Sequence, residues 1–328
     1  MMKKTLMSGI TPSGKLTIGH LFGCIQSWQA LASEYQCFLG VMNLHALTVQ
    51  TDPKQLHDNV LDAIALYVAS GFNPEEHCLF VQSEIPQHTQ LAWFLSCHTS
   101  IGQLFRMTQF KDKSHQSDEA NTGLLTYPIL MAADILLYGT DCVPVGDDQK
   151  QHLELTRDIA ARINHHFGAV FTLPEPYIRK RGARIMSLQD PDKKMSKSDP
   201  NHNSYIGLTD QDSIIKKKIM KAVTDSQASV VSDSSRPGIR NLIDLYQLLS
   251  HDSIDAIERR YQHSSYKPFK EDLADLLINF LSPIREKFHA IRDDHTELTR
   301  IITSGNEYAQ ARAQTTLDRL KDKTGFAL

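Results

Sequence analysis

The first two thirds of the chain alternate between short apolar runs and longer stretches in which apolar residues recur at helical spacing. The most clearly marked helical stretch follows Asp52-Pro53, an N-cap residue with a proline at the first helical position, and it stops at Gly71. Further stretches with helical spacing cover residues 18–35, the region through Trp93 and Phe94, 124–138 and 149–165. The apolar runs predict buried strands at 5–8, 37–49, 79–81 and 142–146.

Strands that alternate with helices predict a parallel sheet with right-handed crossovers, so we expect a Rossmann-like, doubly wound α/β fold. Ligands of such a sheet bind at the carboxyl ends of the strands, where the loop from Pro12 to His20 is expected to lie. After residue 200 only helical spacing remains, in residues 213–223, 240–249, 270–288 and 306–321. We therefore expect two domains, 1–200 and an all-helical 201–328, with a polar insertion near 111–121.

The composition is that of an ordinary soluble globular protein, with 41% hydrophobic residues, 22% charged residues and a formal net charge of −3. No apolar run approaches the roughly 20 residues that a membrane-spanning helix needs, and the N-terminal segment is too short for a signal peptide. The five cysteines form no Cys-x-x-Cys pair, which argues against a zinc ribbon or a disulfide framework. A reduced cytoplasmic protein without a membrane partner is expected.

Two short motifs carry most of the functional information. In Thr17-Ile18-Gly19-His20, Gly19 would let a flat ring approach the backbone, and His20 could donate a hydrogen bond to phosphate. Lys194-Met195-Ser196-Lys197-Ser198 is a loop with two ammonium groups and two hydroxyls, which suit leaving phosphates. Taken separately, they could be an ordinary helix turn and a solvated lysine-rich loop. As a pair they predict a site for a nucleoside triphosphate.

Residues 9–15 match a phosphate-binding P-loop up to its lysine. The next residue is Leu16, which cannot ligate magnesium as a serine or threonine would, and Pro12 removes a backbone N–H from the loop. We therefore reject a P-loop and interpret the segment as a loop that enters a helix.

The two motifs together resemble the paired signatures of the class I aminoacyl-tRNA synthetases, written HIGH and KMSKS, and the second matches letter for letter. The resemblance implies that the carboxylate of an amino acid attacks the α-phosphate of ATP and that pyrophosphate leaves. Lys194 and Lys197 would stabilise the pyrophosphate, with Ser196 and Ser198 as hydrogen-bonding partners of the phosphates. Such chemistry depends on positioning and charge stabilisation rather than on a covalent nucleophile.

Tyr127, Met131 and Asp134 share one face of the predicted helix 124–138, at spacings of four and three residues. A carboxylate on an otherwise apolar face needs a partner. The N–H of an indole is one such partner, and Met131 is suited to pack against an aromatic ring. The alternative is a carboxylate at a helix end that caps a neighbouring element.

Segments 9–10, 12–14, 131–136, 145–149 and 194–198 resemble those of the bacterial tryptophanyl-tRNA synthetases, and the resemblance spans nearly the full chain. It implies a tryptophan site formed by Asp134, Met131, Tyr127, Gln149, His45 and Met7. It implies that ATP is surrounded by Thr11, Pro12, Ser13, Gly19, His20, Gly146, Asp147, Asp148, Ile185, Lys194, Met195, Ser196, Lys197 and Ser198. Lys113 would be a third lysine that contacts phosphate. Thr11 and Met7 depart from the family, where a glutamine and an aromatic residue are common.

The resemblance further implies ATP with Mg²⁺ as substrate, L-tryptophan and tRNA(Trp) as partners, and a homodimer. The helical domain 201–328 would bind the anticodon stem. The basic runs at 179–181 with Arg184 and at 216–218 with Lys221 either contact tRNA or are solvated surface. Because the cysteine pattern of cluster-binding relatives is absent, neither an iron–sulfur cluster nor zinc is expected. The alternatives are a tyrosine-specific relative and a non-catalytic relative that binds tryptophan or RNA for regulation.

Overall fold

The computed structural model describes residues 3–49, 52–114, 121–178, 184–197 and 199–327, the side chains of 112–114 and 147 excepted. Contacts divide the chain into two compact units. The sheet unit comprises residues 1–13, 28–180 and 294–328, and the helical unit comprises residues 14–27 and 181–293. These units do not follow a single division at residue 200, because the segment that carries His20 groups with the helical unit and the last helix groups with the sheet.

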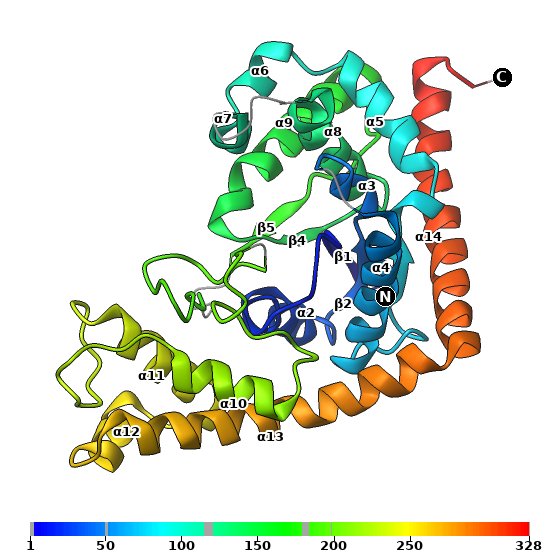
Figure 1. The fold of residues 1–328 in the computed structure, drawn as a ribbon. Helices are drawn as coiled ribbons and strands as arrows, with labels where there is room; N and C mark the ends of the chain where they lie inside the picture. The colour runs from blue at the N-terminus through cyan, green and yellow to red at the C-terminus, as the bar shows by residue number, and fades with distance from the viewer. Residues whose placement is uncertain (1–2, 50–51, 115–120, 179–183, 198, 328) are drawn as a thin grey trace. The chain divides into compact units, whose positions relative to one another are not determined.

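The sheet unit is built on five parallel strands in the order β3-β2-β1-β4-β5 (Figure 1). Their bounds are β1 Lys4–Ile10, β2 Tyr35–Val41, β3 Cys78–Val81, β4 Cys142–Pro144 and β5 Glu175–Tyr177. The strand order reverses between β1 and β4, and such a reversal opens a crevice at the carboxyl ends of the strands. The expected Rossmann-like α/β fold is confirmed.

Helices pack on this sheet, and one of them comes from the C-terminal end of the chain. The helices after β2 and β3 are α3 Asn43–Ala46, α4 Pro53–Ala69, α5 Gln87–Cys97, α6 Ile101–Phe105, α7 Thr108–Ser114 and α8 Thr122–Leu136. The remaining two are α9 Lys150–Phe167 and α14 His295–Thr324, which is coloured orange to red in Figure 1. Gly305 of α14 lies directly against Leu79 of β3, since a Cβ there would stand 1.8 Å from the Leu79 carbonyl oxygen.

One strand prediction in the sheet unit was wrong. The strand predicted to run from 37 to 49 ends at Val41, and Asn43–Ala46 form α3, whose Leu44 N–H donates to the side chain of Gln82 (3.0 Å). Of the polar insertion predicted near 111–121, the first residues belong to α7 and Asn121 caps α8, while residues 115–120 lie outside the described part. Strand β5 was missed because all three of its residues are exposed, so no apolar run marks it.

The first helix of the helical unit is α1 Ile18–His20, which continues through a π-helical segment, Leu21–Ile25. The next helix, α2 Gln26–Leu31, passes from this unit into the sheet unit at Trp28. The other helices of the helical unit are α10 Asp212–Lys221, α11 Pro237–Ser250, α12 Ile254–Tyr261 and α13 Tyr266–Asp293. The π segment contributes Phe22, which stacks on Phe280 of α13 with ring centroids 5.5 Å apart. This stacking fixes the first helical segment to the C-terminal half of the unit. Among the described helices of the chain, none combines the length and apolarity needed to cross a membrane.

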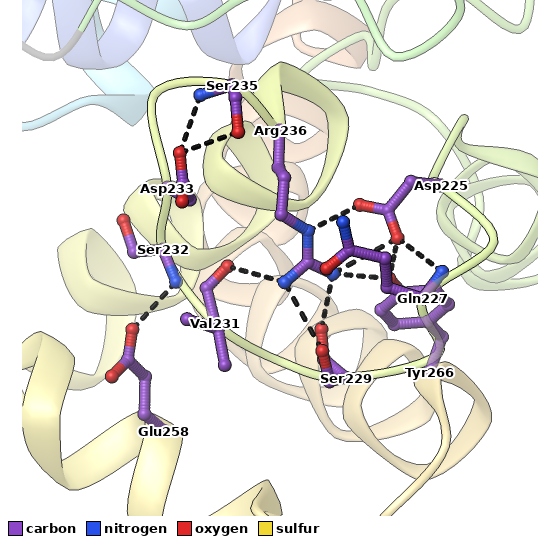
Figure 2. A network of polar contacts seen from close by, with 10 residues as sticks. All are labelled: Asp225, Gln227, Ser229, Val231, Ser232, Asp233, Ser235, Arg236, Glu258 and Tyr266. Carbon is purple, nitrogen blue, oxygen red and sulfur yellow. Dashed lines mark hydrogen bonds and ion pairs between the residues drawn. The ribbon is translucent and has the colours of Figure 1, made fainter.

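A buried guanidinium organises the loop between α10 and α11 (Figure 2). Arg236 donates through Nε and Nη2 to the carboxylate of Asp225 (2.7 and 3.1 Å) and also to the Ser229 carbonyl (2.7 Å). The hydroxyl of Tyr266, at the start of α13, donates to Asp225. The Arg236 side chain is only 6% exposed and that of Asp225 is 28% exposed, so this loop is held by a buried guanidinium with a partly exposed carboxylate partner.

Replacing Arg236 with methionine is expected to reduce the free energy of unfolding by about 1.5–3 kcal/mol, because the loop loses the charge-assisted hydrogen bonds that this buried guanidinium donates to Asp225. Urea unfolding of both proteins measures the difference. The matched control is Arg240→Met, in which an exposed side chain 3.9 Å from Asp244 is removed at an expected cost below about 0.5 kcal/mol. Equal losses in the two variants would contradict a special role for the Arg236 network.

Candidate functional site

Candidate residues of the sheet unit follow four neighbouring strands at the points where these strands end. Residues 11–13 follow β1, His45 lies on α3 after β2, Gln82 follows β3, and residues 146–149 follow β4. Carboxyl ends of parallel strands meet at one edge of a sheet. The sheet topology therefore gathers groups that are up to 138 positions apart in the sequence, from residue 11 to residue 149.

Asp134 lies on α8 and is 2% exposed. Its Oδ2 is 2.7 Å from His45 Nε2, and its Oδ1 accepts from Gln82 Nε2 and from His88 Nδ1, each at 2.7 Å. A buried carboxylate with three polar partners is stabilised as an anion in spite of its removal from water. The helix-end capping role that the sequence left open does not describe this residue, because its partners come from three other segments of the unit.

Burial alone would raise the pKa of Asp134, but His45 and then His88 oppose this effect and hold the pKa below its usual range. The carboxylate is thus ionised at physiological pH. Burial keeps the pKa of the neighbouring Tyr138 well above its ordinary value, so its hydroxyl remains protonated. The site offers a fixed negative charge beside a neutral phenol.

The other residues predicted around an aromatic ligand lie in the same unit. Met7 is 3% exposed in the apolar cluster that Met131 packs against. His45 and Tyr127 form an edge-to-face pair with ring centroids 6.2 Å apart, and the Tyr127 hydroxyl is 2.7 Å from Nε2 of His152. Burial first, then the charge of Asp148, raises the pKa of Tyr127 to about 12.

The loop after β4 is compact. Gln149 donates its backbone N–H to the Gly146 carbonyl (3.0 Å) and its side-chain amide to Asp148 (3.3 Å). A Cβ at Gly146 would stand 2.8 Å from the Asp148 carboxylate, so a larger residue would displace that side chain. Gln109 of α7 donates to the Asp148 carbonyl at 3.0 Å, which ties α7 to this loop. Lys113 lies on the same helix, but its side chain is outside the described part.

In the helical unit, His20 completes a capping box at the start of α1. The Thr17 backbone N–H donates to Nδ1 of His20 (3.1 Å), and the Thr17 hydroxyl lies 3.0 Å from the same nitrogen. A backbone N–H is always a donor, so Nδ1 is the acceptor and the proton of the neutral ring resides on Nε2. The local fold thereby leaves His20 with an Nε2–H that can donate to a ligand.

The lysine motif is folded against the same segment. Lys194 pairs with Met186 in an isolated antiparallel bridge, and Met195 donates its N–H to the carbonyl of Ile185, which is 3% exposed. A Cβ at Gly19 would lie 3.7 Å from Met195 Cβ, and one at Gly14 would lie 3.7 Å from Lys197 Cδ. Gly14 has φ 147°, a backbone conformation that favours glycine. Ser198 lies outside the described residues.

The charges of this region act on one another. Burial is the main cause that lowers the pKa of His20 to about 3, and the ammonium groups of Lys197 and Lys194 lower it further. Burial also lowers the pKa of Lys197 to about 8. Neutral His20 and two lysines therefore lie within electrostatic reach of one another. Such a set can bind the oxygens of a polyphosphate.

The residues of the candidate basic runs differ in their exposure to solvent. Lys216, Lys217 and Lys221 are exposed on α10, whereas Lys218 is 6% exposed, 2.6 Å from the Asp210 carboxylate and 4.9 Å from the centroid of the Tyr205 ring. Lys218 is thus a structural ion pair, and the expectation that it belongs to a tRNA-facing or solvated run was wrong. Arg184 is exposed, and residues 179–181 lie outside the described part.

Sequence reasoning missed three side chains near Asp134. Gln82 and His88 donate hydrogen bonds to its carboxylate, and Tyr138 contacts His88. Tyr138 ends the same apolar stretch as Asp134, but the other two follow β3, 52 and 46 positions away. The available signal was their place after a buried strand. That signal does not say which side chain turns toward α8.

The chain resembles known proteins over nearly its whole length. The family model described as class I tRNA synthetases (W and Y) matches residues 2–282. The chain is 47% identical to a tryptophan–tRNA ligase of Clostridium tetani over 327 residues, which are 99% of this chain and 97% of that protein. It is 47% identical to the tryptophan–tRNA ligase of Bacillus subtilis over 326 residues, covering 99% and 98%.

Solved structures give the same result. Tryptophanyl-tRNA synthetase from Mycoplasma pneumoniae superposes with a TM-score of 0.87 at 38% identity, covering 99% of this chain and 98% of that chain. The enzyme from Campylobacter jejuni, complexed with ADP and tryptophan, has a TM-score of 0.87 at 33% identity and covers 98% and 99%. A tyrosyl-tRNA synthetase from Aeropyrum pernix, at 20% identity and a TM-score of 0.68 over 93% and 90%, shares the fold.

Proposed function

Because the chain belongs to the class I tRNA synthetases for tryptophan and tyrosine, we propose that it is a tryptophan–tRNA ligase. It activates L-tryptophan with ATP to tryptophanyl-adenylate and pyrophosphate, and then transfers tryptophan to tRNA(Trp). In the first step an oxygen of the tryptophan carboxylate forms a bond to the α-phosphorus, and the bond from that phosphorus to the bridging oxygen breaks. In the second step a terminal ribose hydroxyl of the tRNA attacks the activated carbonyl, and AMP leaves.

The observation that carries the proposal is the clustering of neutral His20 with the charges of Lys194 and Lys197. Pyrophosphate gains negative charge as it leaves, and fixed donors and cations stabilise that charge in the transition state. Nε2–H of His20 donates a hydrogen bond to a phosphate oxygen, and the two ammonium groups neutralise the leaving group. The proposal assigns Ser196, Ser198 and Lys113 to the same phosphates.

The proposal places the indole of tryptophan against Asp134, with Met131 and Met7 beside the ring. Tyr127, His45 and Gln149 bind its amino and carboxylate groups. An ionised, buried carboxylate binds a ligand that supplies an N–H more tightly than one that does not. Without the N–H, the desolvated oxygen would stay unpaired. The ionised state of Asp134 supports this assignment.

The proposal surrounds ATP with Thr11, Pro12, Ser13, Gly19, residues 146–148, Ile185 and Met195. Mg²⁺ enters with ATP as part of the substrate. Such an ion keeps phosphate oxygens and waters as most of its ligands and needs few protein groups. That the protein carries neither zinc nor an iron–sulfur cluster stays a prediction.

Pyrophosphate exchange tests the function. The purified protein, ATP, Mg²⁺ and labelled pyrophosphate are combined with each amino acid in turn, and label in ATP is measured. We expect exchange that depends on tryptophan. Exchange that depends on tyrosine would replace the proposal by the tyrosine-specific alternative. Tryptophan binding in calorimetry without exchange would favour a regulatory relative.

The proposed partners beyond the small substrates are tRNA(Trp), bound through the helical unit in the cytoplasm, and a second copy of the chain. Large apolar side chains are exposed on α5 and α6, with Trp93 at 74%, Ile101 at 65% and Phe105 at 49%. Exposed apolar surface of this kind is typical of protein interfaces. It supports a homodimer that uses these two helices.

Trp93→Glu is expected to weaken the homodimer strongly, because it places a charge where an aromatic ring would be buried. Light scattering during gel filtration should give the mass of two chains for the unaltered protein and of one chain for the variant at micromolar concentration. Tyr308→Glu, at another exposed aromatic residue of the sheet unit (47%), is the control and should remain a dimer. A monomer before substitution would contradict the proposal.

The depressed pKa of Lys197 predicts an alkaline limb in the pH profile. Its ammonium group is charged below about pH 8 and loses its proton as the pH rises through that value, so kcat/KM for ATP should fall there. Lys197→Arg stays charged over the whole range, so its profile should lose this limb, whatever its absolute rate. Identical alkaline limbs in both proteins would assign the titration to another group.

A further inference from the structure

Hydrogen-bond capacity distinguishes the two oxygens of Asp134. An ionised carboxylate has about four acceptor positions, two on each oxygen. Oδ1 already accepts from Gln82 and His88, whereas Oδ2 has a single partner among the described residues, His45. One acceptor position therefore remains, and it is on Oδ2.

The surroundings of His88 fix the proton on Nδ1. This nitrogen is 2.7 Å from a carboxylate oxygen, which accepts only, so Nδ1 is the donor. The other ring nitrogen, Nε2, is 2.7 Å from the Tyr138 hydroxyl. The ring is fully buried and stacks on Phe80, with centroids 5.8 Å apart and planes 18° apart. Partners at both nitrogens and this stacking leave the His88 ring one orientation.

We propose that His88 is a positioning residue for recognition of the indole N–H. It acts through Asp134: with Gln82 it saturates Oδ1 and fixes the carboxylate plane, so that only Oδ2 is open to the ligand. This inference rests on the proposed function, in which Asp134 faces the ring of tryptophan. Tyr138 and Phe80 support the arrangement by holding His88 itself.

The arrangement makes the N–H of the ligand's ring the group on which selectivity depends. A carboxylate free to rotate could turn an occupied oxygen toward the ring and offer a poorly aligned acceptor. A carboxylate locked at Oδ1 presents one well-aligned position. Hydrogen bonds to charged groups contribute about 1.5–3 kcal/mol, which corresponds to a preference of about 10- to 150-fold for a ring with an N–H over the same ring without one.

The test uses tryptophan and its benzothiophene analogue, in which sulfur replaces the ring N–H and the shape is kept. For each protein, kcat/KM in adenylate formation is measured for both compounds at saturating ATP, and the ratio is the readout. The unaltered protein should prefer tryptophan by about 10- to 150-fold. His88→Leu should reduce that ratio by about tenfold or more with little change in KM for ATP.

Two further variants separate positioning from folding. His88→Asn keeps an N–H donor near the position of Nδ1 and should recover much of the ratio. Tyr138→Phe keeps the ring packing, removes only the hydroxyl that holds Nε2 of His88, and should lower the ratio by a few-fold. His77→Leu is the matched control, since it removes another buried histidine of the sheet unit, and it should leave the ratio unchanged.

The outcomes are distinguishable. An unaltered protein that activates both compounds equally would overturn the assignment of Asp134 in the proposed function. A clear preference in the unaltered protein, together with an unchanged ratio in Tyr138→Phe and in whichever His88 variants fold, would overturn the inference and leave the proposed function standing. Equal losses for both compounds in His88→Leu would make His88 a structural residue only.

Discussion

Replacing Lys197 with methionine is expected to slow tryptophan-dependent pyrophosphate exchange by about 10²- to 10³-fold, the usual cost of removing one group that stabilises transition-state charge. The side chain of Lys197 lies beside Gly14, and its ammonium is close enough to lower the pKa of His20. Its charge is held in a partly desolvated position, where electrostatic interactions are stronger than in bulk water. The loss should appear in kcat, with KM for tryptophan little changed.

The chain offers a matched control for this variant. Lys193 is in the same loop, but its side chain is 78% exposed and pairs with Asp190 at 2.8 Å. Lys193→Met should retain the exchange rate within about twofold, because a surface ion pair contributes little. Stopped-flow measurement of adenylate formation distinguishes the chemical step from product release. Similar rates in the two variants would remove Lys197 from the catalytic machinery.

Asp134→Ala should have the second large effect, on both stability and the tryptophan requirement. Removal of the carboxylate leaves donors of His45, Gln82 and His88 without their acceptor in a buried place, and we expect the free energy of unfolding to fall by about 3–5 kcal/mol. The variant also loses the proposed acceptor for the indole N–H. KM for tryptophan should rise by about 10²-fold, while KM for ATP changes much less.

Steady-state kinetics with one substrate varied and the other saturating measures the two effects separately. Asp141→Ala is a suitable comparison, because Asp141 also accepts a hydrogen bond in the sheet unit, from the Thr5 N–H at 2.8 Å, but at the amino end of the strands. It should lose stability without a selective rise in the tryptophan requirement. Equal increases for both substrates in Asp134→Ala would show that the carboxylate is structural.

The fold was predictable wherever the signal is local. Asp52-Pro53 and Gly71 enclose α4 because an N-cap, a first-turn proline and a terminal glycine each act on the backbone next to them. The end of β2 was not predictable in this way. Residues 43–46 follow the apolar run directly and alternate polar and apolar side chains, yet they form a helix whose backbone is held by Gln82, a residue 38 positions away from Leu44. Periodicity contains no information about such a partner.

The residues of the candidate site likewise divide into those with local partners and those whose partners are distant in the sequence. Thr17 and His20 interact within one helical turn, so their motif could be recognised from the sequence. Asp134 was identified because a carboxylate on an apolar face needs a partner, but the partners were not. His88 is fully buried and lies near no charged motif, so only the packing of α5 against α8 connects it with Asp134. Lys218 shows the reverse error, since a run of lysines gave no indication that this side chain is buried and paired with Asp210.

The capping contact at His20 also affects how its imidazole ring reacts with electrophiles. Reagents that acylate imidazole attack the nitrogen that lacks a proton, and in His20 that nitrogen is Nδ1, whose lone pair is already engaged by Thr17. Histidines such as His263 and His289, by contrast, are exposed to solvent. The first turn of α1 should thus make Nδ1 of His20 a poor target for acylating reagents, while the proton on Nε2 keeps this nitrogen a hydrogen-bond donor.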